Sequence, residues 1–249
     1  MSATRRPERR LKAPLESSSG LAGAPPGPIG FLGGSFDPVH AGHLQLARDA
    51  MRALALRQLY FVPAGQPWQK PALTPAQERL RMLELALAGD ASWRVDRREI
   101  DRPGPTYTVD TALALRAEAG PERPLVWILG SDQLGRLPTW HRWRELAGLV
   151  HLACADRAGS PPELDPAMQA YVREHPGSAA QLARQPAGLV VRFAMQAVDC
   201  SATAVRAALR AGDPREAARC LAAPVREHIR LHHLYETEHG NEKAATPGD

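Results

Sequence analysis

Residues 33–44 read GGSFDPVHAGHL, and they join a short apolar segment to a stretch with helical spacing. The apolar segment is PIGFL, residues 28–32, which runs directly into the two glycines. From residue 43 to residue 56, apolar side chains recur every three or four positions, the period of an α-helix. The stretch therefore predicts a strand, a glycine turn and a helix, the unit that opens many parallel α/β sheets.

The rest of the chain repeats this alternation. Apolar runs predict strands at residues 58–62, 125–129, 149–153 and 189–193. Periodic segments predict helices at residues 75–88, 109–119 and 166–174, and an all-helical part at 201–235. Thr74 is expected to be the N-cap of the 75–88 helix, with Pro75 at its first position and Gln77 completing a capping box. We expect an α/β fold with a doubly wound, Rossmann-like parallel sheet and a helical C-terminal part.

Composition divides the 249 residues into one domain and two tails. Residues 1–27 are basic at the start and then rich in Ser, Gly, Ala and Pro, so a flexible extension is predicted rather than an organellar targeting signal. Residues 28–237 are predicted to form a single domain, a length that α/β domains often reach. Residues 238–249 are predicted to be a flexible polar tail.

Charge and hydropathy exclude several classes of protein. The net charge is +4, and the first 12 residues account for it with five basic side chains against one acidic. The remaining chain is neutral, which argues against a nucleic-acid-binding module. No run of about 18 apolar residues predicts a membrane span, and the start lacks the apolar core of a secretory signal. We therefore expect a cytoplasmic protein.

The three cysteines are Cys154, Cys200 and Cys220. They are odd in number and far apart, without the short spacing of a zinc or redox motif. This pattern is interpreted as buried thiols in a reducing compartment.

The glycine turn has the properties of an anion site. Backbone N–H groups at a helix start carry partial positive charge, and glycines let a phosphate approach the backbone closely. His40 and His43 are three apart, so they can face one side of the first helical turn, and Gly42 removes a side chain between them. Imidazoles there can donate hydrogen bonds to phosphate oxygens. A histidine pair of this spacing is also compatible with a capping or metal arrangement.

The whole string resembles the Gly-x-Phe-x-Pro-x-His-x-Gly-His signature of the nucleotidyltransferase superfamily. The resemblance implies that His40 and His43 are catalytic. It also implies that ATP is bound at Gly33, Gly34, Ser35, Phe36 and Gly42.

A second element lies at residues 200–206, where Ser201 is a good N-cap for a helix. Thr203 and Arg206 are three apart, so both lie on one face near the positive helix end. Taken alone, this pattern is also typical of a capped surface helix. It looks like the Ser-Ser/Thr-x-x-Arg element with which the same superfamily holds the β- and γ-phosphates of ATP, although Ala202 replaces a second serine. The resemblance implies a catalytic Arg206 and ATP contacts by Ser201 and Thr203.

Residues 104–111 resemble the Gly-Pro-Ser-Tyr-Thr-x-Asp-Thr segment of bacterial nicotinate mononucleotide adenylyltransferases, with Thr106 in place of serine. The resemblance implies that Thr106, Tyr107 and Thr108 belong to the acceptor site, where Tyr107 and Thr108 present backbone N–H groups to the nicotinate carboxylate. Read without it, the segment is a helix-entry turn with Thr108 as the cap.

Residues 130–143 match the same family's Gly-x-Asp and Leu-x-x-Trp pattern. Asp132, just beyond an apolar strand, is expected to bind ribose hydroxyls, and Trp140 to stack on the pyridine ring. Trp143 is interpreted as a core residue. Lys70 is expected to attract a substrate phosphate, although the preceding Gln69 replaces the family's histidine.

The resemblance covers residues 28–235 and implies adenylyl transfer from ATP to nicotinate mononucleotide in NAD biosynthesis, by direct in-line attack. Mg²⁺ is expected to accompany ATP, with no metal site made by protein carboxylates. A homo-oligomer is compatible with the sequence. Nicotinamide mononucleotide and phosphopantetheine remain alternative acceptors, and a non-catalytic nucleotide sensor is the alternative from a different class.

Overall fold

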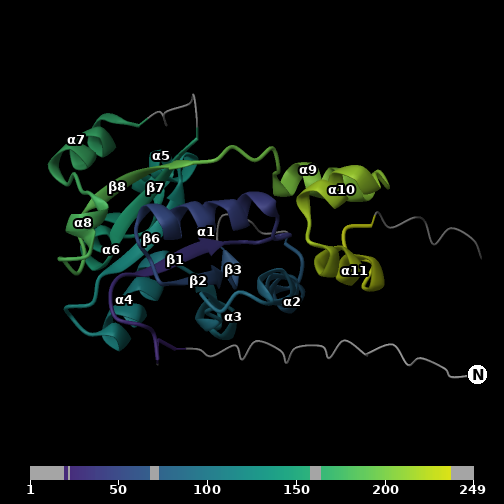
Figure 1. Ribbon diagram of the computed structural model, residues 1–249, viewed down its shortest axis with the longest axis horizontal. Helices are drawn as coiled ribbons and strands as arrows, with labels where there is room; N and C mark the ends of the chain where they lie inside the picture. The colour runs from purple at the N-terminus through teal and green to yellow at the C-terminus, as the bar shows by residue number, and fades with distance from the viewer. Residues whose placement is uncertain (1–19, 22, 68–72, 158–163, 237–249) are drawn as a thin grey trace, which may run out of the picture.

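The computed structural model describes residues 20–21, 23–67, 73–157 and 164–236 (Figure 1). Its centre is a six-stranded sheet in which every neighbouring pair is parallel, in the order β4-β2-β1-β6-β7-β8. The strands are β1 (Ile29–Gly34), β2 (Gln58–Pro63), β4 (Trp93–Val95), β6 (Leu125–Gly130), β7 (His151–Arg157) and β8 (Val190–Met195). Short strands β3 (Gln66–Pro67) and β5 (Pro105–Thr106) pair separately. The predicted doubly wound parallel sheet is confirmed.

The strand order reverses direction at β1. The chain passes from β1 to β2 and β4 on one side, and then returns to place β6, β7 and β8 on the other. In open α/β sheets, ligands bind at this switch point, outside the carboxyl ends of the strands. The carboxyl ends of β1 and β6 are Gly34 and Gly130, so the fold brings the two glycine segments of the sequence together.

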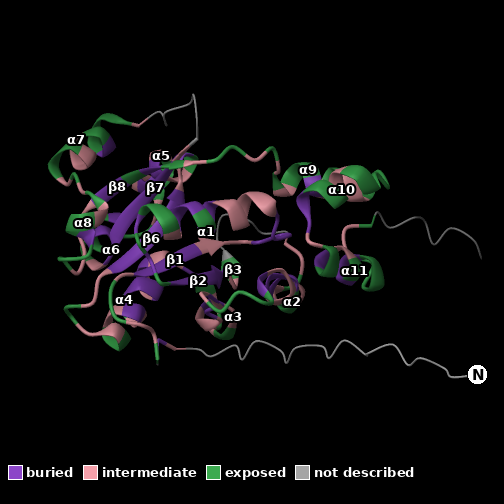
Figure 2. Cartoon of the chain, viewed as in Figure 1, coloured by how far each residue is buried: buried purple, intermediate pink, exposed green. Residues whose placement is uncertain are grey.

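Two layers of helices cover the sheet, and Figure 2 shows the strands buried between helices whose outer faces are exposed. One apolar cluster lies under α1 (Ala41–Ala53), α2 (Ala76–Leu87) and the C-terminal helices, and includes Leu32 and Ile128. The other lies under α4 (Thr108–Ala119), α5 (Ser131–Arg136) and α6 (Trp143–Leu149), and includes Phe31 and Trp127. Successive strand residues point to opposite faces, so the uninterrupted apolar runs serve both clusters.

The remaining helices are shorter. They are α3 (Arg98–Asp101), the 3₁₀ helix η1 (Leu137–Thr139), α7 (Pro166–Glu174), α8 (Ala179–Leu182), α9 (Ala202–Arg210), α10 (Pro214–Cys220) and α11 (Ala223–Leu231). Figure 1 shows α9, α10 and α11 grouped at one end of the molecule. Among the helices of the described residues, none is long and apolar enough to cross a membrane.

Two predicted helix caps were wrong. Thr74 does not cap α2, because Pro75 is the N-cap and makes no side-chain capping bond. The Thr74 N–H instead donates to Asp37 and its carbonyl accepts from Arg79, so tertiary contacts hold this residue. Thr108 is the first residue of α4, and the cap is Tyr107.

The interpretation of the cysteines was wrong for two of the three. Cys200 and Cys220 form a disulfide across 20 residues of sequence, linking the segment before α9 to the end of α10. Cys154 in β7 is the buried free thiol, and burial raises its pKa to about 12. Sequence spacing alone did not reveal the pair, because α10 packs against α9 and so brings the two Cα atoms to 5.7 Å.

Most of the two predicted tails lies outside the described residues, so their flexibility stays a prediction. Within the predicted extension, Leu21 is buried against the second cluster and its backbone N–H donates to Glu118.

Candidate active site

A cleft of about 560 Å³ opens at the switch point of the sheet. The ends of β1 and β6 form its floor, and its walls come from α1, the start of α4, α5, the turn that follows η1 and the start of α9. Most of the predicted site residues line it: Gly33, Gly34, Ser35, His40, Gly42, His43, Thr106, Tyr107, Thr108, Asp132, Trp140 and Ser201. Two segments about 160 residues apart in the chain therefore contribute to one cavity.

His40 and His43 form the start of α1. His40 is the N-cap, and its Nδ1 accepts the backbone N–H of Gly42 at 3.2 Å. His43 Nδ1 accepts the backbone N–H of His40 at 3.3 Å, which completes a capping box made of two imidazoles. Their ring centroids are 3.8 Å apart. Because each Nδ1 accepts a hydrogen bond, a neutral ring carries its proton on Nε2, which makes Nε2–H the donor.

Gly42 is required by this packing. A Cβ at residue 42 would lie 3.0 Å from the His40 ring and 3.2 Å from the carbonyl oxygen of Cys200. The start of α1 and the residue before α9 therefore lie so close together that a side chain at residue 42 would force its neighbours to shift.

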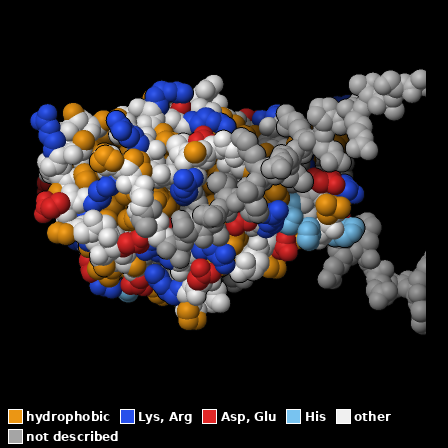
Figure 3. All heavy atoms as spheres, turned by 60° about the horizontal axis from the view of Figure 1, so that its bottom comes forward, with side chains coloured by type: hydrophobic (Ala, Val, Ile, Leu, Met, Phe, Trp, Pro, Cys, Tyr) orange, Lys and Arg blue, Asp and Glu red, His pale blue; other side chains and the backbone are white. Residues whose placement is uncertain are grey.

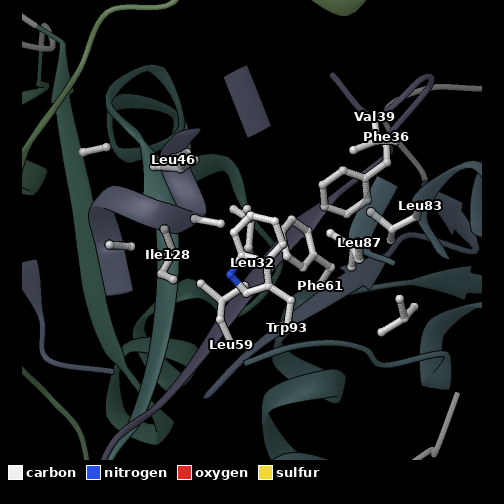
Figure 4. Close-up of a cluster of buried hydrophobic side chains, with 14 of the residues drawn as sticks. Leu32, Phe36, Val39, Leu46, Leu59, Phe61, Leu83, Leu87, Trp93 and Ile128 are labelled. Atoms are coloured by element: carbon white, nitrogen blue, oxygen red, sulfur yellow. The ribbon is translucent and has the colours of Figure 1, made fainter. Parts of the chain in front are cut away.

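Phe36 anchors the glycine loop in the first apolar cluster and does not line the cleft. It is fully buried, and Figure 4 shows its ring among the side chains of the first cluster, near Phe61. The ring edge meets His43 at 5.0 Å between centroids. Phe36 has a φ of 47°, a conformation that costs a non-glycine residue free energy. Burial of the ring offsets this cost and fixes the loop beneath the histidine.

Asp37 joins the glycine loop to three other segments. Its backbone carbonyl accepts from Arg206 at 2.7 Å, and its carboxylate accepts the Thr74 N–H at 3.3 Å and the Tyr235 hydroxyl at 2.5 Å. Burial and the hydrogen bond to Asp37 raise the pKa of Tyr235, so its hydroxyl stays a donor. The glycine turn and the start of α9 therefore meet in the structure.

The start of α9 carries the second predicted element. Ser201 is its N-cap, as predicted, and accepts the Ala204 N–H at 3.1 Å. Arg206 extends toward Asp37 and lies 3.5 Å from the Thr203 hydroxyl. In the described part of the chain, Ser201 lines the cleft, whereas Thr203 and Arg206 lie outside its wall.

The acceptor end of the cleft is aromatic. Tyr107 packs on His141 with ring centroids 4.6 Å apart, and both line the cavity with Trp140. The indole N–H of Trp140 is buried and has no hydrogen-bond partner among the described residues. Trp143 is a core residue, as predicted. Asp132 is exposed and accepts a hydrogen bond from Gln133.

Two charged side chains that support the site were missed as functional residues. Arg79 is 1% exposed and donates to the carbonyls of Ser35, Gly65 and Thr74, at 2.8, 3.1 and 2.9 Å. It ties the glycine loop to the segment after β2 and to the entry of α2. An arginine within the apolar face of a predicted helix was the signal that could have revealed it.

Glu99 also went unnoticed. It lines the cleft from α3, is 6% exposed and accepts the Thr111 hydroxyl at 2.7 Å. Desolvation raises the pKa of this carboxyl to about 7. No sequence pattern marked it, because its burial results from tertiary packing.

Lys70 lies outside the described residues. Among the described residues, those that line the cleft include no group that could hold a metal. The carboxylates of the cleft are Glu99, Asp132 and Asp199, and they do not bring three ligand atoms close together.

This fold and cleft define a nucleotidyltransferase-type protein, and comparison with known proteins agrees. The profile of the cytidylyltransferase-like family matches residues 31–208. A "Probable nicotinate-nucleotide adenylyltransferase" of Laribacter hongkongensis is 46% identical over 84% of this chain and 95% of its own length. A protein of the same name from Dechloromonas aromatica is 39% identical over 84% and 97%. The chain therefore belongs to the cytidylyltransferase-like family and, within it, to the nicotinate-nucleotide adenylyltransferases.

Solved structures agree with the fold. The nicotinic acid mononucleotide adenylyltransferase of Plasmodium falciparum, complexed with APC, superposes with a TM-score of 0.64, covering 84% of this chain and 97% of its own. The same enzyme complexed with NaAD gives a TM-score of 0.63. At 15 and 16% identity, these neighbours establish the fold.

Proposed function

We propose that this chain transfers the adenylyl group of ATP to nicotinate mononucleotide, giving nicotinate adenine dinucleotide and pyrophosphate in the cytoplasm. An oxygen of the acceptor phosphate forms a bond to the α-phosphorus of ATP. The bond from that phosphorus to the oxygen bridging to the β-phosphate breaks, and pyrophosphate leaves on the opposite side. Family membership and the names of the relatives support this reaction.

The observation that carries the assignment of the site is the contact between the glycine loop and the start of α9. The Arg206 bond to Asp37 and the close approach of Gly42 to Cys200 support one phosphate-binding edge built from both segments. This edge offers donors from two helix starts, which favour anions.

Catalysis in this scheme is positioning and charge stabilisation. Nε2–H groups of His40 and His43 donate to oxygens of the α- and β-phosphates, where negative charge develops as pyrophosphate leaves. Ser201 at the cleft wall holds the β- and γ-phosphates together with Thr203 and Arg206, which lie just beyond the wall, so this arrangement requires the triphosphate to extend past it. Because Arg206 is bonded to the Asp37 carbonyl on one side, its planar guanidinium is oriented before ATP arrives.

The acceptor occupies the aromatic end of the cleft. Trp140 stacks on the pyridine ring, and the backbone N–H groups of Tyr107 and Thr108 bind the nicotinate carboxylate. The aromatic contact between Tyr107 and His141 holds this turn in place. Asp132 binds ribose hydroxyls, and Lys70 attracts a substrate phosphate.

A divalent metal typically accompanies ATP in adenylyl transfer. The described cleft residues do not fit a protein-held metal site, since the raised pKa of Glu99 disfavours the ionised ligand that a hard cation needs. We therefore propose Mg²⁺ as a part of the MgATP substrate, and no protein step depends on it.

An assay with paired acceptors tests this proposal. Pyrophosphate release is followed with ATP and nicotinate mononucleotide, nicotinamide mononucleotide or phosphopantetheine in parallel. Release with the nicotinate form, far above the others, is the expected result. Preference for another acceptor would contradict the assigned substrate, and absence of release with all three would favour a nucleotide sensor.

A further inference from the structure

A cluster of two histidines and one glutamate lies apart from the cleft, between α2 and the end of α11. His228 Nε2 is 2.7 Å from Glu78 Oε2, and His232 Nδ1 is 4.0 Å from Glu78 Oε1. One ligand atom from each residue lies within 4.8 Å of the other two, and the imidazole ring centroids are 4.2 Å apart. None of the three lines the cleft, so adenylyl transfer does not account for them.

The chemistry of this set is that of a metal site. His228 and His232 are four residues apart, so they lie on the same side of one helical turn, and Glu78 meets them from the facing helix. Around tetrahedral zinc, ligand atoms at about 2.0–2.1 Å from the metal lie roughly 3.4 Å from one another. The two separations, 2.7 and 4.0 Å, run to different oxygens of Glu78, and one ligand atom from each of the three residues lies within 4.8 Å of the other two. Side-chain rotation therefore has to bring the three ligand atoms to a common metal distance.

The three side chains differ in how far they are exposed, which leaves one side of the cluster open to a metal ion. The exposed fractions are 10% for His228, 29% for Glu78 and 50% for His232. The cluster is therefore enclosed on the protein side and open toward His232, where a water molecule can complete the coordination. Figure 3 shows histidine side chains gathered near the end of the molecule that α11 occupies.

We propose that Glu78, His228 and His232 bind a zinc ion with three protein ligands and one water. Two imidazoles and one carboxylate select zinc and neighbouring transition metals over Mg²⁺ or Ca²⁺, which prefer oxygen ligands. A zinc ion there would link α11 to α2 at a distance from the cleft. The proposal does not depend on the proposed function.

The proposed metal site lies close in sequence to Tyr235, which contacts the glycine loop. Tyr235 follows His232 by three residues and bonds to Asp37 in the glycine loop. A metal that fixes the end of α11 therefore also restricts the segment carrying Tyr235.

The test uses the full chain without a histidine tag, treated with a chelator and then dialysed. Isothermal titration with Zn²⁺ should give saturable one-to-one binding and raise the Tm. Co²⁺ should give the visible absorption of a tetrahedral site. His232→Gln should weaken zinc binding by about 100-fold or more, which is at least the effect of removing a supporting contact to a ligand.

His233→Ala is the matched control, because His233 is the next residue, is exposed and interacts with Glu236 instead. It should bind zinc as wild type does. Glu78→Gln is a second cluster variant, which keeps the test decisive if His232→Gln folds poorly. Absence of one-to-one binding, or equal zinc affinity in wild type, His232→Gln and Glu78→Gln, would overturn the proposal.

Discussion

At the scale of single residues, the active site depends on which ring nitrogen each histidine uses. His40 and His43 both use Nδ1 to accept backbone N–H groups, so helix capping and the phosphate binding that we propose involve different atoms of the same side chain. Each histidine therefore has a structural role and, in the proposed function, a catalytic one. A substitution that retains a hydrogen-bond acceptor for the capping bond but removes the Nε2–H donor distinguishes the two roles.

His43→Ala should lower turnover by about 10²-fold or more, the scale of removing one preorganised donor. His43→Asn should lower turnover similarly, but its side-chain oxygen should retain part of the capping bond and hence more of the wild-type Tm. The measurements are kcat for pyrophosphate release and thermal unfolding. A variant with wild-type kcat would refute the role of His43.

Glu99 makes stability depend on pH. Folding raises the pKa of its carboxyl from 4.5 to about 7, so the folded protein holds this proton more tightly than the unfolded chain. The contribution of Glu99 to stability is therefore greatest below pH 4.5 and decreases as pH rises through 7. Glu99→Gln removes this dependence.

We expect the unfolding free energy of Glu99→Gln, minus that of wild type, to increase by roughly 2 kcal/mol between pH 5 and pH 8. Urea unfolding at both pH values measures it. A difference that does not change with pH would show that the carboxyl titrates normally.

At the scale of elements, the disulfide holds the entry of α9. Cys200 directly precedes the N-cap Ser201, and its partner Cys220 ends α10. Closing a loop of 20 residues in the unfolded chain stabilises a protein by about 3 kcal/mol on chain-entropy grounds. The bond also fixes the residue whose carbonyl approaches Gly42.

A reducing agent should therefore lower the Tm of the oxidised wild type and raise the KM for ATP. The double variant Cys200→Ser/Cys220→Ser should show both effects without reductant and should not respond when reductant is added. An equal response of wild type and double variant to reductant would contradict this role. In the proposed cytoplasmic location, the reduced form is the expected one.

Sequence patterns predicted the elements where local chemistry decides the structure. Apolar runs gave the five long strands, and Ser201 was correctly predicted as a cap. The three-residue β4 and the two-residue β3 and β5 were missed, because such short segments have no periodicity to detect. The prediction that Thr74 caps α2 was wrong because the buried Arg79 and Asp37 form hydrogen bonds with its backbone instead.

The residues of the site likewise divide into those that belong to local motifs and those that depend on contacts between distant parts of the sequence. The two segments that we propose to bind phosphate have local motifs, so most of the residues that line the cleft there could be named from the sequence. Arg79, Glu99 and the link from Asp37 to Tyr235 depend on residues far apart in the sequence, and no local pattern encodes them.

At the scale of the whole molecule, the glycine loop is held by residues from both ends of the domain. Tyr235→Phe removes a hydroxyl donor from Asp37, which is 3% exposed. Loss of a donor to a buried carboxylate costs about 1–3 kcal/mol. We expect a lower Tm and a higher KM for ATP, because Asp37 also carries the carbonyl that orients Arg206.

Tyr171→Phe is the control, since Tyr171 lies in α7, away from the cleft. It should leave the KM for ATP unchanged. If Tyr235→Phe and wild type had the same ATP kinetics, the Tyr235 hydroxyl would have no influence on the ATP site.

The contacts of Asp37 also affect the order of events during synthesis on the ribosome. Its partners at residues 74, 206 and 235 all follow the loop in the sequence, the last of them by 198 residues. A nascent chain can build its first strands and helices early, yet it lacks the final hydrogen bond to the loop. Full nucleotide affinity should therefore arise only after the segment that carries Tyr235 has left the ribosome and reached Asp37.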